Sequence, residues 1–427
     1  MPKRRILACR HVLSGNPVWA LGGPRCGRPS SGFPIKAFGN DRGVIVDRGV
    51  APIFFSGKGK EQWATHRRNI CTLLRLHEYH SETSVTFHQV HVPRHRTPLT
   101  PRRTILTLGI LFFILLASAV LSLMVGSTPM SLSDIVRALF VSTDSSGDIA
   151  RVILIDIRLP RVLLALIVGA GLSIAGATLQ ALLRNPLAEP YILGISSGGT
   201  VGALIAMMSG IGMAHLTTPL FSFIGSGLVM LLVFALGHRR GSLDTNALLL
   251  SGVMVGAFFS AIVLLFTALV NQDLRATYLW LIGNLSSADL KSFWVVGPFI
   301  ILASAGLIAQ ARFYNLISTG DETAMHLGVE VDKVKRYSYL LASFITGLAV
   351  SVSGVVGFVG LVVPHACRLV LGPDHRLLLP ASFLAGASYL VLCDLLSRVV
   401  LAPSEVPVGV ITAVVGAPVF IYLLKKS

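Results

Sequence analysis

The sequence predicts an all-α polytopic membrane protein with about ten transmembrane helices. Hydrophobic residues make up 53% of the 427 residues and charged residues only 13%, whereas about a quarter of the residues in a soluble domain are charged. The mean hydropathy is +0.73. From Thr104 onward, apolar runs long enough to cross a bilayer follow one another, separated by short polar or charged stretches.

The first apolar run begins after Pro101-Arg102-Arg103 and continues without a charged residue to Met124. A helix needs roughly 20 apolar residues to span the hydrocarbon core, so this run predicts the first span. Gly169, Ser173 and Ala177 share one helix face in the second run, and small residues let helices pack closely in lipid. The predicted spans are residues 104–124, 162–182, 191–209, 217–236, 246–270, 292–310, 337–357, 358–371, 377–398 and 408–424, of which the eighth is short.

Residues 1–100 form a basic extension that is distinct from the transmembrane domain, residues 101–427. Residues 1–103 contain 18 Lys and Arg against 5 Asp and Glu, whereas residues 104–427 contain 18 against 15. The extension shows no sustained periodicity and no apolar run of a secretory signal, so we expect it to be disordered, or not to be translated if the true start is a valine such as Val90 or Val92. It lacks the features of a nucleic-acid-binding module, and no nucleic-acid partner is expected.

The positions of Lys and Arg predict the orientation of the spans. With ten spans and a cytoplasmic N-terminus, thirteen of these residues lie on the inner side of the membrane and seven on the outer side. This distribution follows the positive-inside rule. Both termini of a multi-pass protein in the cytoplasmic membrane are then expected to be cytoplasmic.

The longest charged interruption in the apolar half is the segment of residues 312–336. We predict two short helices that meet at Gly320, with Gly328 ending the second helix, because glycine commonly follows a helix C-terminus. Asp321 and Glu322 then fall in the first turn of the second helix, where acidic side chains interact favourably with the helix dipole. On the predicted orientation this segment is cytoplasmic.

Several motifs follow one another in a fixed order along the chain. They are Arg158-Leu-Pro-Arg161, Asn185-Pro-Leu-Ala-Glu-Pro190, Gly357-Phe-Val-Gly-Leu-Val-Val-Pro-His365, Gly372-Pro-Asp-His-Arg376 and Glu405-Val-Pro-Val-Gly-Val410. With these motifs the chain resembles the permease subunits of type II ATP-binding-cassette (ABC) importers, which move ferric siderophores, haem and cobalamin. The resemblance covers about residues 104–427 and leaves the basic extension unexplained.

The resemblance implies a transport subunit rather than an enzyme. It implies a homodimer or a pair of like permease subunits, two ABC ATPase subunits and an extracytoplasmic substrate-binding protein. The sequence contains no GxxxxGK[ST] motif that would cradle a triphosphate, so ATP is expected on the partner ATPase. The five cysteines show no CxxC spacing, and we expect no cofactor or metal to be bound by this chain.

The resemblance also implies a function for the charged segment. In the family the matching loop forms two cytoplasmic coupling helices that insert into the ATPase. The residues that match this pattern are Asn315, Gly320, Asp321, Glu322, Ala324, Leu327 and Gly328.

Arg158, Arg161 and Arg398 resemble the family's docking sites for acidic residues of the binding protein, and a guanidinium binds a carboxylate in bidentate fashion. A structural role is the alternative, because Asp394 and Arg398 lie four residues apart on one helix face and can pair with each other. Both interpretations stay open for Arg398.

The cytoplasmic gate of the family is built from the turn after the second span and the start of the fifth. Asn185 and Leu187 match the first part, and Thr245 and Asn246 match the second. Helix capping is the alternative, since Asp244 and Thr245 are favourable N-cap residues before an apolar run.

A secondary transporter driven by an ion gradient is the main rival function. Such a transporter uses intramembrane carboxylates, and Asp394 is the residue of this type, near the end of a span. The cargo is not chosen by the sequence, although Asp273-Leu-Arg275 and Trp280-Leu-Ile-Gly283 lean towards the cobalamin-type members.

Overall fold

A computed structural model of the chain describes residues 37–40, 43–46, 53–55, 100–126, 128–140, 149–209, 217–239, 242–269, 278, 280–402 and 404–426. The chain divides into two units, Met1–Arg96 and Thr97–Ser427. In the first unit, the strands β1 (Ala37–Asn40), β2 (Gly43–Val46) and β3 (Ile53–Phe55) pair antiparallel in the order β1-β2-β3. This sheet is not predicted from the sequence, because strands of three and four residues are too short to show periodicity. Val90 and Val92 lie outside the described residues, and the prediction of an internal start is not tested.

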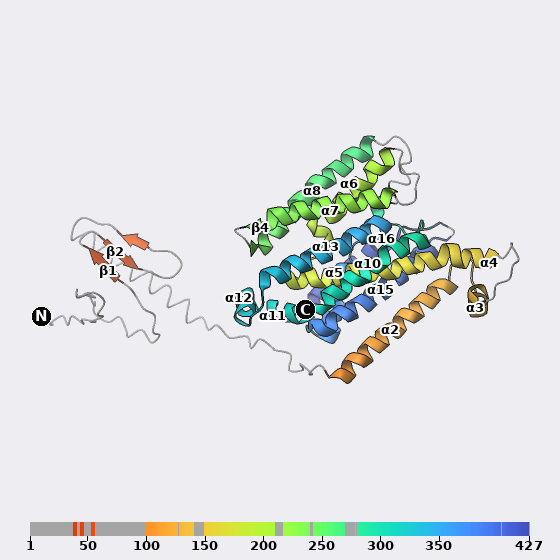
Figure 1. Cartoon of the computed structure of the whole chain (residues 1–427), viewed down its shortest axis with the longest axis horizontal. Coiled ribbons are helices and arrows are strands. Elements are labelled where there is room, and N and C mark those ends of the chain that lie inside the picture. Colours follow the sequence, from red (N-terminus) through yellow and green to blue (C-terminus); the bar gives the residue numbers. More distant parts are fainter. Residues whose placement is uncertain are drawn as a thin grey trace. The chain divides into compact units, whose positions relative to one another are not determined.

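The second unit is built from helices (Figure 1). Ten of them coincide with the predicted spans, which confirms the predicted fold class. They are α2 (Pro101–Met124), α5 (Leu159–Leu182), α6 (Ile195–Met208), α7 (Thr217–Gly237), α8 (Thr245–Leu269), α10 (Leu290–Ala309), α13 (Val331–Ser353), α14 (Val359–Leu371), α15 (His375–Val399) and α16 (Val408–Lys426).

Short elements connect these helices. Between α2 and α5 lie α3 (Leu132–Phe140), α4 (Ile149–Val152) and a π-helix, η1 (Ile153–Arg158), which runs directly into α5. The 3₁₀ turn η2 (Pro190–Leu193) precedes α6, and the two-residue strands β4 (His238–Arg239) and β5 (Ser242–Leu243) join α7 to α8. The helices α11 (Ala311–Ile317) and α12 (Asp321–His326) fall inside the predicted charged segment.

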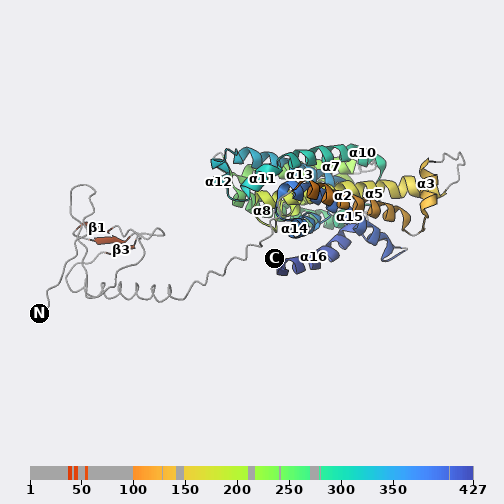
Figure 2. The same ribbon diagram turned by 90° about the horizontal axis from the view of Figure 1, so that it is seen from below.

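Helix α5 is the centre of the bundle. It packs against α10, α13, α14 and α15. Of the most apolar stretch in the continuous helical run Ile149–Leu182, which ends with α5, 89% is buried, against 6% in α2. Helices α6, α7 and α8 pack against one another on the far side of α13 from α5 (Figure 1). Helix α16 contacts α14 and α15 and lies along the edge of the unit opposite α10 (Figure 2).

Small residues bring the backbones of α5 and its neighbours together. A side chain at Gly176 would collide with the backbone carbonyl of Gly360 on α14, and one at Gly169 would collide with that of Gly386 on α15. Ser173 packs against Gly386 on the same face. The predicted close packing through this helix face is therefore present, as expected where lipid gives no hydrophobic drive for association.

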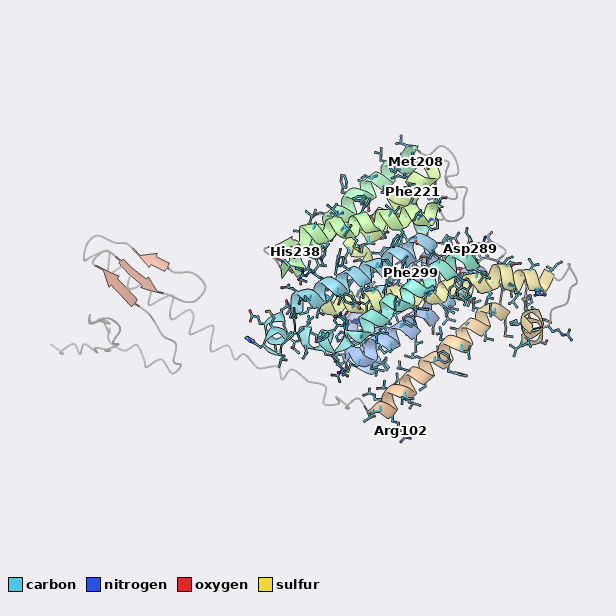
Figure 3. The ribbon with its side chains drawn as sticks, in the orientation of Figure 1. Arg102, Met208, Phe221, His238, Asp289 and Phe299 are labelled. Carbon is cyan, nitrogen blue, oxygen red and sulfur yellow. The ribbon has the colours of Figure 1, made fainter. Side chains whose placement is uncertain are left out.

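The outer surface of the helices is suited to lipid. Large apolar residues such as Phe113, Leu264 and Leu302 are at least 70% exposed, and Phe299 on α10, labelled in Figure 3, is 53% exposed. His238 lies at one end of the bundle and Asp289 near the other (Figure 3). We call the end where α5 begins the outer end and the end where it finishes the inner end, after the predicted orientation.

The observed spans differ from the prediction mainly at their boundaries. Within the part of the chain that the structure describes, six helices are long and apolar enough to cross a membrane, and α6, α14 and α16 are shorter apolar helices. Helix α14 has 13 residues, so the eighth span is short as predicted. Helix α13 begins at Val331 rather than at residue 337, because four charged residues form its first turns.

Candidate coupling and gating site

The charged segment folds into two short helices, as predicted. Helix α11 ends at Ile317 and α12 begins at Asp321, with Gly320 as the N-cap residue between them. Gly320 has φ +130° and Gly328, after the end of α12, has φ +82°, and glycine adopts both conformations without the steric cost of a Cβ atom. Asp321 and Glu322 lie in the first turn of α12, where their charge complements the helix dipole.

Helix α12 has a buried side and an exposed side. Ala324 is fully buried, and the backbone N–H of Val329 donates to its carbonyl at 3.0 Å, which closes the C-terminal end of the helix. Glu322 is exposed, and the side chains of Met325 and Leu327 are 54% and 62% exposed. Two exposed apolar side chains beside an acidic one form a surface on which a protein partner can pack.

Asn315 fastens α11 to the start of α15. Its side-chain nitrogen donates to Asp374 Oδ1 at 2.8 Å, and its side-chain oxygen accepts from the backbone N–H of His375 at 2.9 Å. Asp374 in turn caps α15 by accepting from the backbone N–H of Arg376. Asn315 therefore holds the charged segment against the bundle rather than facing outward.

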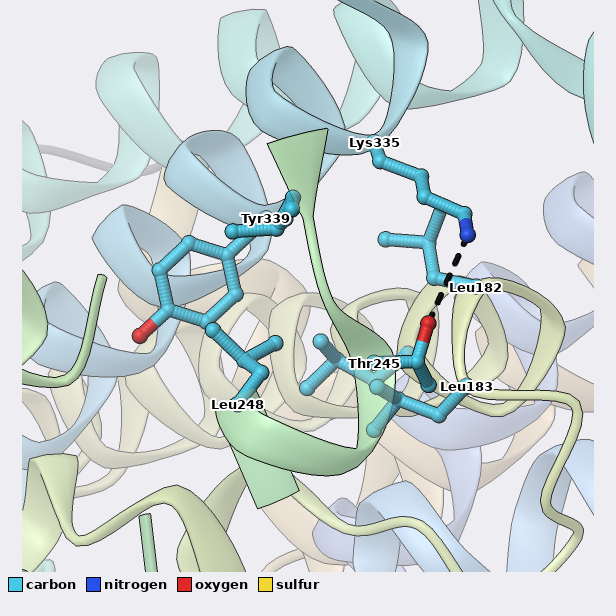
Figure 4. A pocket seen from close by; sticks show the side chains of 8 residues that line it. Leu182, Leu183, Thr245, Leu248, Lys335 and Tyr339 are labelled. Atoms are coloured by element: carbon cyan, nitrogen blue, oxygen red, sulfur yellow. Dashed lines mark hydrogen bonds between the residues drawn. The ribbon is translucent and has the colours of Figure 1, made fainter. Parts of the chain in front are cut away.

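The first residue of α12 connects to two other elements through its carboxylate. Lys335 Nζ on α13 lies 2.6 Å from Asp321 Oδ2, and Arg184, just after α5, lies 3.5 Å from the same oxygen. Lys335 also donates to Thr245 Oγ1 at 3.4 Å at the start of α8 (Figure 4). We call Arg184, Asp321 and Lys335 the inner charged cluster.

The predicted gate residues lie on two turns at the inner end. Asn185 Oδ1 accepts from the backbone N–H of Leu187 at 2.9 Å, and Leu187 is 44% exposed. At the start of α8, Asp244 Oδ1 accepts from the backbone N–H of Asn246 at 2.8 Å. Of the two residues considered as helix caps, Asp244 is therefore the one that caps α8, and Thr245 is not.

A small cavity lies between these turns and α13. Figure 4 shows Thr245, Leu248, Lys335 and Tyr339 around it together with the end of α5. It is lined by Leu179, Leu182, Leu183, Leu243, Thr245, Leu248, Lys335 and Tyr339. The structure therefore brings Thr245 next to the end of α5, while Asn246 points its exposed side chain away from the core.

The three arginines predicted to dock a binding protein lie buried at the outer end. Arg158 and Arg161 are 4% exposed and Arg398 is 8% exposed. Arg158 donates to the carbonyls of Leu123 and Thr128, which closes the end of α2. An exposed docking surface is therefore not formed by these side chains in this conformation, and their contact with a partner is not tested.

Arg161 and Arg398 share a buried carboxylate on α15. Asp394 is fully buried and lies 2.6 Å from Arg161 Nε and 3.2 Å from Arg398 Nε, so the alternative of an Asp394–Arg398 pair is confirmed. Arg161 also lies 2.8 Å from Glu405, before α16. We call Arg161, Asp394, Arg398 and Glu405 the outer charged cluster.

Sequence reasoning missed three residues that the structure places at these sites. Lys335 was considered only as one charge of the segment of residues 312–336, Glu405 only as part of a motif, and Glu189 only as part of a turn. Glu189 Oε1 accepts from the backbone N–H of Phe358 at 2.6 Å, and Phe358 has φ +67° before α14. The signal for Lys335 was present, because Asp332 and Lys335 fall on the helix face that continues into the buried stripe of α13.

These features define a class: a multi-pass, all-α membrane protein with two short charged helices at one end of its bundle. Within this class, the model of the FecCD transport family matches residues 114–426, and the chain belongs to this family. The match covers all the described spans except the first part of α2.

The chain is similar to several curated permeases. It is 43% identical over 279 residues to the uncharacterized ABC transporter permease YvrB of Bacillus subtilis, covering 64% of this chain and 79% of that protein. It is 43% identical over 276 residues to the cobalamin import permease BtuC of Halobacterium salinarum, covering 65% and 74%. It is 40% identical over 327 residues to the hemin transport permease HmuU of Yersinia pestis, covering 75% and 96%.

A solved structure shares the architecture. It is described as an inward-facing conformation of a metal-chelate type ABC transporter, and it is 30% identical to this chain, with a TM-score of 0.67 over 75% of this chain and 99% of that one. The bundle arrangement is therefore that of a known permease fold.

Proposed function

We propose that this chain is the membrane-spanning permease subunit of an ATP-driven importer for a metal chelate. Two copies, or one copy and a like subunit, would form the pathway, with two ABC ATPase subunits on the inner side and a binding protein on the outer side. The FecCD match and the cobalamin, hemin and iron-hydroxamate permeases among the relatives support this function. Both chain termini are then cytoplasmic.

The observation that carries the proposal is the construction of α12. This helix is fastened to the bundle through Ala324 and through the Asp321–Lys335 pair, yet it exposes Glu322, Met325 and Leu327. A fastened helix with an exposed mixed surface can transmit the movement of a partner to the bundle, whereas a solvated linker would have no fixed contacts. The chain has no P-loop of its own, so the proposed partner here is the ATPase.

The gate proposal rests on the turns at the inner end. Leu187 lies on the turn after α5, and Thr245 is the first residue of α8. The end of α5 and the start of α8 line the same cavity. Movement of either turn changes how α5 and α8 meet. We place the constriction of the pathway at these turns.

The cargo class is proposed as a metal chelate, with cobalamin as the favoured member. The relatives named for cobalamin are 43% and 39% identical to this chain, and the relative named for hemin is 40% identical. Asp273 and Arg275, on which the sequence leaned towards cobalamin, lie outside the described residues.

Reconstitution in liposomes tests the function. The chain is combined with a candidate ABC ATPase and a candidate binding protein, and the uptake of cyanocobalamin, haemin and a ferric hydroxamate is measured with and without ATP. We expect ATP-dependent uptake of one chelate and none when the P-loop lysine of the ATPase is replaced. Uptake driven by a proton or sodium gradient without ATP would show a secondary transporter instead.

A further inference from the structure

Lys335 is a buried cation at the inner end of α13. Its side chain is 5% exposed, while that of Lys333, two residues earlier on the same helix, is 71% exposed. Fully buried lysines are rare in proteins unless they are paired, because removing an ammonium group from water costs several kcal/mol. A buried position for Lys335 therefore needs an explanation that Lys333 does not.

The ammonium group of Lys335 joins three separate segments. It lies 2.6 Å from Asp321 at the start of α12 and 3.4 Å from Thr245 at the start of α8. Through Asp321 it is linked to Arg184, which directly follows α5 and precedes the turn at Asn185. One side chain thus touches the coupling helix and one proposed gate turn, and it reaches the other gate turn through a shared carboxylate.

The cavity side of this contact is apolar. The same cavity that Lys335 lines is formed by the ends of α5 and α8 and by Tyr339, one turn further along α13 (Figure 4). Among the described residues, Asp321 is the carboxylate that pairs with Lys335, and its second oxygen, Oδ1, is buried without a hydrogen-bond partner. The pair is consequently sensitive to displacement, because Asp321 is the carboxylate within ion-pair distance of Lys335 among the described residues, while Asp332, three residues earlier on α13, accepts from the backbone N–H of Leu243 instead.

We propose that Lys335 is a positioning residue that transmits movement of α12 to the two gate turns. This inference rests on the proposed function, in which α12 binds the ATPase. When α12 moves, Asp321 moves with it, and Lys335 follows because a buried ammonium left without its counter-ion is costly. Thr245 and the end of α5 then lose or gain their contact with Lys335. The long flexible stem and single point charge of lysine suit such a moving contact.

The test compares variants in the complete reconstituted transporter. The substitutions are Lys335→Met, Asp321→Asn and the exchange Lys335→Asp with Asp321→Lys, and the matched control is Lys333→Met. The measured quantity is the coupling ratio, the number of chelate molecules taken up per ATP hydrolysed, with cyanocobalamin, haemin and a ferric hydroxamate as the probes. Thermal unfolding in detergent is followed alongside.

We expect Lys335→Met and Asp321→Asn to lower the coupling ratio about tenfold, within the usual range of allosteric coupling, while ATP hydrolysis continues. Lys333→Met should leave the ratio unchanged, and the charge exchange should restore part of it. If Lys335→Met and Asp321→Asn lower only the unfolding temperature and not the ratio, Lys335 is merely structural and the inference is wrong. Should Lys335→Met fail to fold, Asp321→Asn alone decides, since its carboxylate is partly exposed.

The unsubstituted transporter separates this inference from the proposed function. If it shows no ATP-dependent uptake of any of the three probes, the proposed function fails. If it does show uptake and the Lys335 and Asp321 variants keep the same coupling ratio, only the inference fails.

Discussion

The two ends of α5 carry charged clusters of similar composition but opposite construction. At the outer end, Asp394 is fully buried between Arg161 and Arg398, whose side chains are 5% and 7% exposed. At the inner end, Asp321 is 29% exposed between a buried Lys335 and an Arg184 that is 45% exposed. A helix of 24 residues separates them, which is about 36 Å at 1.5 Å per residue.

The difference shows which end can move. In the outer charged cluster each guanidinium has further partners, since Arg161 also contacts Glu405 and Ser397, and Arg398 donates to Ser122 on α2. Glu405 at the edge of this cluster is 46% exposed, but the contacts around the fully buried Asp394 are short and fix one geometry. The inner charged cluster is partly exposed to solvent. One close ion pair, Lys335–Asp321, holds its segments together. We therefore interpret the outer cluster as a rigid fastening between helices, which we call the clasp. We interpret the inner cluster as a contact that can move, which we call the joint.

The largest effect is expected from breaking the clasp. Asp394→Asn leaves two buried guanidinium groups without their shared counter-charge, and breaking a buried pair from one side costs about 3–5 kcal/mol of stability. Chemical denaturation in detergent measures this loss. Glu330→Gln is the control, because Glu330 is 68% exposed and pairs with Lys333 at the surface, where such pairs contribute about 0–1 kcal/mol. Equal losses in the two variants would contradict the clasp.

A second prediction concerns the pH dependence of stability, which is expected to come from the buried carboxyl group of Glu189. Glu189 lies on the turn after α5 and has a backbone N–H as its partner rather than an arginine. Burial raises the pKa of Glu189 from 4.5 to about 7, although the hydrogen bond from Phe358 opposes this. The folded protein then holds a proton between pH 4.5 and 7 that the unfolded chain has released, so stability falls as the pH rises through this window, by at most about 3 kcal/mol.

Glu189→Gln provides the measurement for this prediction. The amide oxygen can still accept from Phe358, but the side chain no longer titrates. We expect the unfolding temperature of the unsubstituted protein to decline from pH 5 to pH 8 and that of the variant to decline less. Parallel pH profiles would show that Glu189 does not contribute.

A third prediction concerns the backbone of the joint. Gly320 has φ +130° and ψ +145°, a region that is nearly restricted to glycine, so Gly320→Ala should cost about 1–3 kcal/mol. It should also lower the coupling ratio, because α12 would begin in a different direction. Gly227→Ala on α7 is the control, since it lies in a helix with nothing within 4 Å of the added Cβ atom and should not destabilise. A Gly320 variant that couples normally would contradict the prediction.

The contrast between the two ends also shows what the sequence could predict. The apolar runs predicted ten spans, and the pattern around Gly320 predicted α11 and α12, because both depend on residues close in sequence. The pair of Asp394 and Arg398 was open to prediction for the same reason, being four residues apart. Arg161 was not, because its partners Asp394 and Glu405 lie 233 and 244 residues away.

Long-range contacts explain the other differences. The sequence placed the start of the seventh span after the charged residues, yet α13 begins at Val331, since Lys335 is neutralised by Asp321 and can enter the packed bundle. The second span was expected at residue 162, whereas the helix runs on from η1, because carbonyl groups at and after the end of α2 accept hydrogen bonds from the Arg158 guanidinium. In each case a partner far along the chain lets a charged residue occupy a helix at the edge of the membrane domain.

The smallest effect is expected at Arg184, the solvent-exposed residue of the inner charged cluster. Arg184 is 45% exposed and 3.5 Å from Asp321, so Arg184→Gln should change stability by less than about 1 kcal/mol, and high salt should remove the difference. Arg184 also has φ +47°, which asparagine tolerates better than other residues. Arg184→Asn should therefore be no less stable than Arg184→Gln, although both lose the ion pair. If Arg184→Gln were as harmful as Asp394→Asn, the inner cluster would be a second clasp, and movement of α12 would have to reach the gate turns by another route.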